Sequence, residues 1–263
     1  MDLGLKNKVA LVAGGSMGLG LAVAKRLAHE GAKIAICALD DPHLALAKEE
    51  IFRETGAEVF AFGANLSDPV AARDFVSSAN RHFGTVDILV NNAGGPPSLQ
   101  FLEISDEQWL EGFHLNLLST IAMTAVAVPV MKEKKWGRIV NITSISVKQP
   151  IEGLILSNTI RSGVIGFSKT LSNELAPLNV TINSVCPGYT LTERVRKLSV
   201  ILAEKRQTTP EAVIAGWEND IPMKRLGTPE EFAALVAFLA SELAAYITGA
   251  AIQIDGGWYK GVM

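Results

Sequence analysis

The chain has 263 residues, 48% of them hydrophobic and 19% charged, which suits one large α/β domain. Its net charge of −3 at pH 7 provides no basic surface, so neither nucleic acid nor an anionic membrane is an expected partner. The four histidines, at positions 29, 43, 82 and 114, show no metal-ligand spacing, so we expect no metal site.

Cysteine usage and apolar stretches indicate a cytoplasmic protein. Cys37 and Cys186 lie far apart in apolar runs, a pattern typical of buried thiols in a reducing compartment. Residues 1–6 contain no hydrophobic signal core. The longest apolar stretch, residues 115–131, is interrupted by polar residues and by Pro129, so no membrane span is expected.

Short apolar or β-branched runs alternate with helical patterns from end to end. Strands are predicted over residues 8–13, 33–38, 58–62, 86–90, 138–142, 180–185 and 250–254. Helices are predicted over residues 18–30, 42–55, 69–83, 105–131, 154–176 and 229–241. Repeated strand–helix–strand units require right-handed crossovers, so residues 1–263 should form a single Rossmann-like domain. We expect a doubly wound parallel sheet of about seven strands with helices on both faces.

Helix boundaries carry recognisable signals. Asp68 precedes Pro69, a pattern of N-cap followed by proline at the first helical position. Residues 105–108 and 228–231 both fit the capping box. Residues 187–227 form the only long stretch predicted to be irregular. Their Ile, Val, Leu and Trp content favours a mobile substrate lid over a disordered linker.

A glycine-rich segment follows the first predicted strand directly and opens an alanine-rich helix. It reads Gly14-Gly15-Ser16-Met17-Gly18-Leu19-Gly20. Glycines allow the backbone to turn sharply and to approach a diphosphate, and the following helix N-terminus offers free N–H groups and a positive dipole end. In this strand–turn–helix context the segment predicts a dinucleotide site at the carboxyl ends of the strands.

The spacing of these glycines resembles that of the short-chain dehydrogenase/reductase family, nearest its 3-oxoacyl-(acyl-carrier-protein) reductase branch. Further landmarks in chain order are residues 91–94 (Asn-Asn-Ala-Gly), Asn116, Ser144, Pro187-Gly188 with Thr192, residues 247–249 (Ile-Thr-Gly) and residues 255–257 (Asp-Gly-Gly). The resemblance covers essentially the whole chain. Two departures are Ala13, where the family usually has Thr, and Asn65, where it usually has Asp.

The resemblance implies which residues bind a nicotinamide dinucleotide. Those near the diphosphate are Gly14, Ser16, Met17, Gly18 and Leu19; those near the adenosine are Asn65, Leu66, Asn91, Ala93 and Gly94; those near the nicotinamide and its ribose are Arg161, Pro187, Gly188 and Thr192. For Asn65 and Asn91 an alternative is a loop asparagine that satisfies only the local backbone.

The choice between NAD and NADP depends on the end of the second strand. An acidic residue there accepts hydrogen bonds from the ribose 2′-hydroxyl, whereas an Arg binds a 2′-phosphate. The family's NAD-users carry Asp where this chain has Ala38, and its NADP-users often carry Arg where this chain has Leu39. Asp40 and Asp41 make the neighbourhood negative, so we expect NAD to be preferred over NADP. The alternative for these aspartates is a helix N-cap ahead of Pro42.

The catalytic motif departs most from the family. Reduction of a carbonyl needs a proton donor at the nascent alkoxide. The family supplies Tyr as the acid, Ser to hold the carbonyl, Lys to lower the Tyr pKa, and Asn to hold a water. Here Ser144 and Asn116 are present, but the Tyr and Lys positions fall on Ser157 and Arg161, four apart on one helix face.

This replacement leaves the proton donor open. A Tyr hydroxyl titrates near ~10, whereas the Ser hydroxyl should be closer to water at ~15.7. Loss of general acid catalysis would lower the rate by roughly 10²–10⁴-fold. The substitutes are Tyr189, which is otherwise a pocket wall, or a water held by Ser157, Ser144 and Asn116. Arg161 could bind ribose hydroxyls or a substrate carboxylate.

Two functional hypotheses follow. The first is an NAD(P)-dependent oxidoreductase that moves a hydride between the cofactor and a small carbonyl or alcohol substrate. The second is a catalytically idle dinucleotide sensor or a non-catalytic partner subunit. The resemblance also implies a homotetramer, in which the helices at 105–131 and 154–176 pair across a two-fold axis.

Overall fold

A computed structural model describes residues 2–39 and 41–262. The strands are β1 (Val9–Ala13), β2 (Lys33–Ala38), β3 (Val59–Gly63), β4 (Ile88–Asn91), β5 (Gly137–Ile142), β6 (Val180–Pro187) and β7 (Ala251–Ile254). The longer helices are α1 (Gly18–His29), α2 (Pro42–Thr55), α3 (Pro69–Phe83), α4 (Asp106–Phe113), α5 (Ser119–Glu133), α6 (Ile155–Leu175), α7 (Glu193–Arg206), α8 (Pro210–Asp220) and α9 (Pro229–Leu239).

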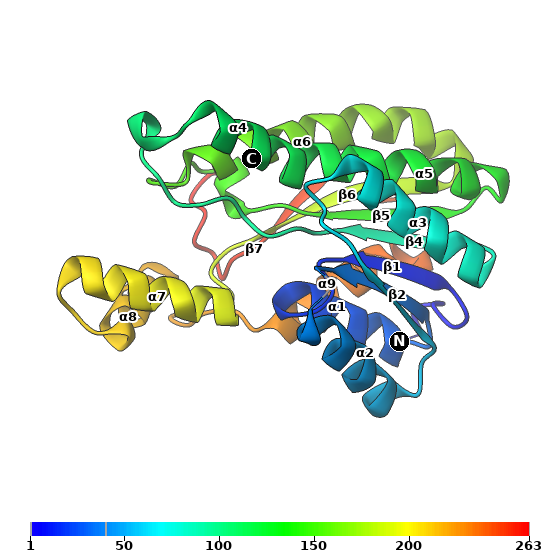
Figure 1. Ribbon diagram of the computed structural model, residues 1–263, viewed down its shortest axis with the longest axis horizontal. Helices are drawn as coiled ribbons and strands as arrows, with labels where there is room; N and C mark the ends of the chain where they lie inside the picture. Colours follow the sequence, from blue (N-terminus) through cyan, green and yellow to red (C-terminus); the bar gives the residue numbers. More distant parts are fainter. Residues whose placement is uncertain (1, 40, 263) are drawn as a thin grey trace.

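The strands form one parallel sheet in the order β3-β2-β1-β4-β5-β6-β7. Helices α1, α2 and α9 cover one face, and α3, α5 and α6 cover the other (Figure 1). A separate hydrophobic core lies on each side, which is why the central strands β1 and β4 are buried along their whole length. The doubly wound Rossmann-like fold predicted from the sequence is confirmed.

The predicted helix starts are also confirmed. The Asp41 carboxylate accepts from the backbone N–H groups of His43 and Leu44, and Pro42 is the first helical residue of α2. Asp68 caps α3 in the same manner, 2.8 Å from the N–H of Val70. Each of these caps satisfies amide groups that have no partner within the helix.

The predicted helix over 105–131 is wrong in one respect, because it is divided. A π-helical turn, His114–Leu118, separates α4 from α5. Asn116 lies in this turn and donates from Nδ2 to the carbonyl oxygen of Gly94, 3.1 Å away. A π-turn inserts one residue into the helical period, and such turns occur often at functional sites. Hydrophobic periodicity did not reveal an insertion of this size.

The prediction that residues 187–227 are irregular is also wrong, because α7 and α8 lie within them. The two helices pack against each other through a small hydrophobic cluster of their own, whose buried members are Ala203, Val213, Trp217, Ile221 and Leu226. In Figure 1 they stand apart from the two layers of helices that cover the sheet. The apolar content of this segment therefore serves a local core.

Within the described residues, one helical stretch, Asp106–Glu133, is long and apolar enough to cross a membrane on those two criteria alone. Its most apolar window has a mean hydropathy of 1.6 and is 39% buried. This stretch is α4, the π-turn and α5, and it covers one face of the sheet beside α3 and α6 (Figure 1). Core helices of soluble proteins meet the same criteria. Because this stretch packs on the sheet, we describe it as a helix of the Rossmann-like domain.

Candidate dinucleotide and catalytic site

The turn between β1 and α1 can be made only by glycines at its critical positions. Gly14 and Gly18 have φ values of +58° and +56°, a region in which side chains are strained. A Cβ on Gly20 would collide with the carbonyl oxygen of Gly14 and lie 2.9 Å from Nδ2 of Asn92. The first turn of α1 therefore approaches the preceding loop more closely than any larger residue would permit.

This turn leaves an anion cradle at the start of α1. Met17 is the N-cap residue, and no side chain caps the amide groups of the first turn. Uncapped amides and the positive end of the helix dipole favour a negatively charged group. The side chain of Asn92 braces the turn from β4, donating to the carbonyl oxygen of Gly14 at 3.2 Å. The residues present therefore fit the diphosphate of a dinucleotide.

Residues that follow β6 cover the same turn. The methyl group of Thr192 lies 3.8 Å from the position of a Cβ on Gly18, and Thr192 caps α7. Pro187 ends β6, and Gly188 faces Asp255 so closely that a Cβ would lie 2.7 Å from the Asp255 side chain. Thr192 thus lies beside the glycine-rich turn, whereas Pro187 and Gly188 lie at the end of β6 against Asp255; their assignment to the nicotinamide stays a prediction.

Asn65 and Leu66, both expected near the adenosine, differ in their exposure to solvent. Asn65 is exposed, and its Oδ1 accepts from the N–H of Ser67 at 3.0 Å, so it satisfies a local turn. Leu66 is buried in the core. Neither position excludes contact with an adenine, but the bond to Ser67 corresponds to the alternative of a loop-turn asparagine.

The Asn91 side chain is directed into the protein interior, away from the site. Its Nδ2 donates to Oδ1 of Asn141 at 2.7 Å and to Oγ1 of Thr124 at 3.1 Å. Asn141 in turn donates to Oγ of Ser168 at 2.8 Å. The Asn91 side chain therefore forms its hydrogen bonds inside the protein and does not line the candidate site. The side chain instead joins β4 to β5 and α5, and through Asn141 to α6.

The described residues at the end of β2 carry no charge. Leu39 is 59% exposed and Met17 is 44% exposed, and both are positions where a cation could bind a 2′-phosphate. Asp41 caps α2, which corresponds to the alternative given for it from the sequence. Asp40 lies outside the described residues. The surface near an adenosine ribose therefore consists of apolar side chains and a capping carboxylate.

Three serine hydroxyls meet beyond the carboxyl end of β5. Oγ of Ser144 accepts from the N–H of Ser146 at 3.1 Å, and Oγ of Ser146 lies 3.3 Å from Oγ of Ser157. Ser146 and Ser157 are buried, and Ser144 is partly exposed. The structure thus brings Ser144 and Ser157 together through Ser146, which sequence reasoning treated only as a neighbour of Ser144.

Arg161 lies one turn further along α6 and is 9% exposed. Its Nη1 donates to the carbonyl oxygens of Ile142 and Thr143, each at 3.0 Å. Burial, together with the positive charge of Arg194, lowers the pKa of Arg161 to about 10. Arg161 therefore joins α6 to the end of β5 and remains a cation at neutral pH.

The other candidate donor, Tyr189, is held in an aromatic group. Its ring stacks on Trp217, with centroids 4.8 Å apart, and meets Trp258 edge-on. Burial raises the pKa of Tyr189, and Asp220 raises it further. A phenol with a raised pKa is a weaker acid, which favours the pocket-wall interpretation over proton donation.

Sequence reasoning missed three residues of the site. Asn92 braces the glycine-rich turn, Ser146 contacts Ser144 through its backbone N–H and Ser157 through its hydroxyl, and Arg194 extends from α7 toward the loop after β4. Asn92 could have been singled out, because it belongs to the Asn91–Gly94 landmark. Nothing in the sequence pattern distinguished Arg194 from the other charged residues between 187 and 227.

The glycine-rich turn, the uncapped start of α1 and the polar residues after β5 define a dinucleotide-binding Rossmann-type domain. A family model described as enoyl-(acyl carrier protein) reductase matches residues 13–259. The chain belongs to the short-chain dehydrogenase/reductase family.

Among its relatives, the 3-oxoacyl-(acyl-carrier-protein) reductase of Aquifex aeolicus is 35% identical and covers 98% of this chain and 100% of its own. The D-beta-hydroxybutyrate dehydrogenase of Rhizobium meliloti is 36% identical over 96% of this chain and 98% of its own. The L-sorbose reductase of Gluconobacter frateurii, solved with NADPH and L-sorbose, superposes with a TM-score of 0.96 at 32% identity over 100% of both chains.

Proposed function

We propose that this protein is an NAD(P)-dependent oxidoreductase acting on a small carbonyl or alcohol substrate. Bound nicotinamide would supply or accept the hydride. The observation that carries the proposal is that the cofactor cradle and the hydroxyl group of Ser144 lie at the same edge of one sheet, with Asn116 and Arg161 beside it. The relatives reported above have the names of carbonyl reductases or alcohol dehydrogenases.

In this proposal Ser144 donates a hydrogen bond to the substrate oxygen. Because Ser144 is partly exposed whereas Ser146 and Ser157 are buried, it is the hydroxyl of the three that a substrate can reach. The backbone N–H of Ser146 holds the orientation of Ser144 Oγ. Solvent water that reaches the partly exposed Ser144 supplies the proton, because no Tyr occupies position 157. A Ser hydroxyl is a poor acid, so we expect turnover slower than a Tyr-dependent site would give.

Turnover can be tested with purified protein, NADH or NADPH, and a panel of ketones, aldehydes and 3-oxoacyl thioesters. Cofactor binding is followed in the same samples by nicotinamide fluorescence. Consumption of reduced cofactor with any carbonyl, at a rate lowered at least about 10-fold in Ser144→Ala, is the expected result. Tight binding without turnover on the whole panel would instead support a catalytically idle dinucleotide-binding module.

The double variant Ser157→Tyr/Arg161→Lys is a useful comparison, with its folding checked by circular dichroism. If hydride transfer limits the rate, restoration of a phenol should raise turnover by roughly 10²-fold or more. Activity that appears only in this variant would show that the natural site is idle.

NAD is the proposed preferred cofactor. Ala38 and Leu39 offer no cation to a 2′-phosphate, and neither does Met17 in the glycine-rich turn. The sorbose reductase and an actinorhodin polyketide ketoreductase were both solved with NADPH, so the proposed preference for NAD rests on the residues of this chain alone. Comparison of kcat/KM for NADH and NADPH tests this directly, and a higher value for NADPH would overturn it.

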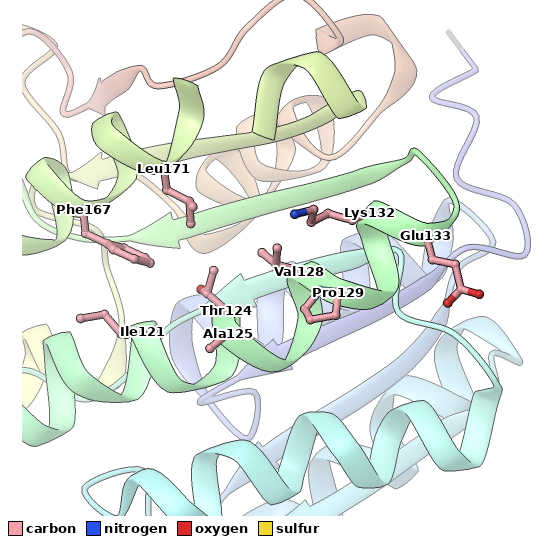
Figure 2. Close-up of a pocket in the computed structure, with 9 residues that line it drawn as sticks. All are labelled: Ile121, Thr124, Ala125, Val128, Pro129, Lys132, Glu133, Phe167 and Leu171. Carbon is pink, nitrogen blue, oxygen red and sulfur yellow. The ribbon is translucent and has the colours of Figure 1, made fainter. Parts of the chain in front are cut away.

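A homotetramer is the proposed assembly, with α5 and α6 forming one interface. A groove of about 630 Å³ runs between these helices. Figure 2 shows Phe167 and Leu171 of α6 directed toward Ile121 and Val128 of α5, leaving an apolar channel open to solvent. A second copy of the chain would cover it.

Light scattering after size exclusion should give four times the 28.1 kDa mass of the chain. Ala125 is exposed in the groove, so Ala125→Glu should lower the mass to that of a dimer or monomer. The matched control is Ala45→Glu, at an exposed site of α2, which covers the other face of the sheet. A monomeric unmodified protein would contradict the assembly.

A further inference from the structure

Two arginines lie at the same end of the cleft but come from different elements. Arg161 belongs to α6, and Arg194 belongs to the first turn of α7. The guanidinium of Arg194 covers Gly95 so closely that a Cβ there would lie 2.6 Å from Nη1 and 2.8 Å from Cζ. The charge of Arg194 also acts on Arg161, since it contributes to lowering the Arg161 pKa.

Neither arginine has an acidic partner. Within the described part of the chain, no carboxylate forms an ion pair with Arg161 or with Arg194. Asp255, behind Gly188, already accepts from the backbone N–H groups of Gly257 and Tyr259. Glu193, next to Arg194, pairs with Lys197. Two cations at the carboxyl ends of the adjacent strands β4 and β5 are therefore without local neutralisation, which is unfavourable unless an anion joins them.

The donors of Arg161 are only partly used. A guanidinium has five N–H groups, and both bonds that Arg161 makes to β5 carbonyl oxygens use Nη1. Its Nε and Nη2 donate to none of the other described residues. A buried, charged group with unused donors can bind a carboxylate in a bidentate manner.

The direction of the Arg194 side chain separates the region of the two arginines from the diphosphate cradle. Thr192, not Arg194, is the residue that contacts Gly18 in the glycine-rich turn. Arg194 lies instead on Gly95, one residue beyond Gly94, whose carbonyl oxygen holds Asn116. Arg194 therefore lies over the loop after β4, and Arg161 is bonded to the end of the neighbouring strand β5.

We propose that Arg161 and Arg194 together bind a carboxylate group of the substrate, so that the substrate is a small oxo acid or hydroxy acid. This inference rests on the proposed function for the reaction, but the binding of an anion does not require turnover. Half-buried Lys148 lies near the same site and adds to its positive charge, since it acts electrostatically on the neighbouring Cys186.

The test is a calorimetric titration of NAD-saturated protein with malonate, with dimethyl malonate as the neutral probe and inorganic phosphate as a second anion. Malonate should bind and its ester should not. Arg194→Met should weaken malonate binding by about 10- to 100-fold, the loss expected for a charge-assisted contact. Lys197→Met, an exposed cation on the same helix, should change it less than about twofold.

Several outcomes would overturn the inference. Absence of malonate binding, or an unchanged affinity in Arg194→Met, would remove the anion site. Weaker NAD binding in Arg194→Met with unchanged malonate affinity would assign the arginine to the cofactor diphosphate. Binding of phosphate in place of malonate would change the substrate class. Malonate binding without turnover of any oxo acid would leave the anion site intact and contradict only the oxidoreductase proposal.

Discussion

The glycine-rich turn after β1 and the serine group after β5 lie at the same edge of the sheet, but they differ in how tightly the backbone fixes their residues. The turn keeps its glycines because the backbone leaves no room for side chains. The serine group lies after β5 and on α6, where Ser157 and Arg161 are held by side-chain hydrogen bonds. The backbone therefore limits which residues fit in the turn. In the serine group, only side-chain contacts limit which residues fit.

The comparison shows why binding and catalysis can separate in one fold. A larger residue in the turn would alter the path of the main chain. Ser157 and Arg161 instead bond to groups of the surrounding fold, the Ser146 hydroxyl and the backbone carbonyl oxygens of residues 142 and 143. Four substitutions compare a site where the backbone leaves no room, Gly20, with sites where only side-chain contacts change, and they follow from the largest expected effect to the smallest.

Gly20→Ala should abolish useful dinucleotide binding. The new Cβ would collide with the Gly14 carbonyl oxygen, and overpacking against backbone of this kind should weaken NADH binding roughly 100-fold. Fluorescence titration measures the change. Gly216→Ala is the control, because a Cβ at this position in α8 meets no atom within 4 Å. Equal affinities in both variants would contradict the backbone constraint.

Asn141→Ala should lower the free energy of unfolding by about 2 to 4 kcal/mol, because Asn91 and Ser168 each lose a buried partner. Urea denaturation monitored by fluorescence gives the value. Asn173→Ala, at an exposed site of α6, should change it by less than about 0.5 kcal/mol. A loss of similar size in the two variants would show that the buried amide network contributes little.

Leu39→Arg should improve NADPH binding about 10-fold relative to NADH, because it places a cation at the end of β2 where a 2′-phosphate would lie. The matched control is Leu46→Arg on α2, since both leucines are 59% exposed. Kd values for both cofactors provide the measurement. An equal gain in the control would indicate a general effect of charge.

Glu231→Gln should have the smallest effect, and the effect should depend on pH. The Arg225 guanidinium, together with the backbone N–H of Thr228, lowers the pKa of Glu231 to about 2. Because the folded-state value is below the ordinary one of 4.5, the carboxylate stabilises the fold above about pH 4.5. That contribution should disappear as the pH falls toward 2.

The midpoint of thermal unfolding at pH 7, 5 and 3 measures this change. The difference between the unmodified protein and Glu231→Gln should shrink between pH 5 and 3. Glu49→Gln, on an exposed face of α2, is the control and should show no such trend. A difference that stays constant over this range would contradict the assigned pairing with Arg225.

Local signals in the sequence predicted the sheet, the caps and the cofactor turn. The alternation of apolar residues in strands and helices depends only on neighbouring residues. The same is true of Gly, Pro or Asp at the boundaries, so both signals can be found from the sequence alone. The π-turn at Asn116, the inward direction of Asn91 and the position of Arg194 depend on contacts between distant segments. The helices α7 and α8 were missed because their apolar residues serve a small local core and show weak helical periodicity.

Both ends of the segment that contains α7 and α8 meet in a single β-bridge between Thr190 and Gly227. The backbone N–H of Leu191 donates to Gly227, and that of Gly227 donates to Tyr189, at 2.9 and 3.0 Å. The segment between these residues is a cassette that leaves and re-enters the sheet scaffold at this bridge, and it also contacts the loops after β1 and β4 through Thr192 and Arg194. Exchange of this cassette between relatives is therefore a route by which new substrate specificities could be engineered without redesign of the sheet.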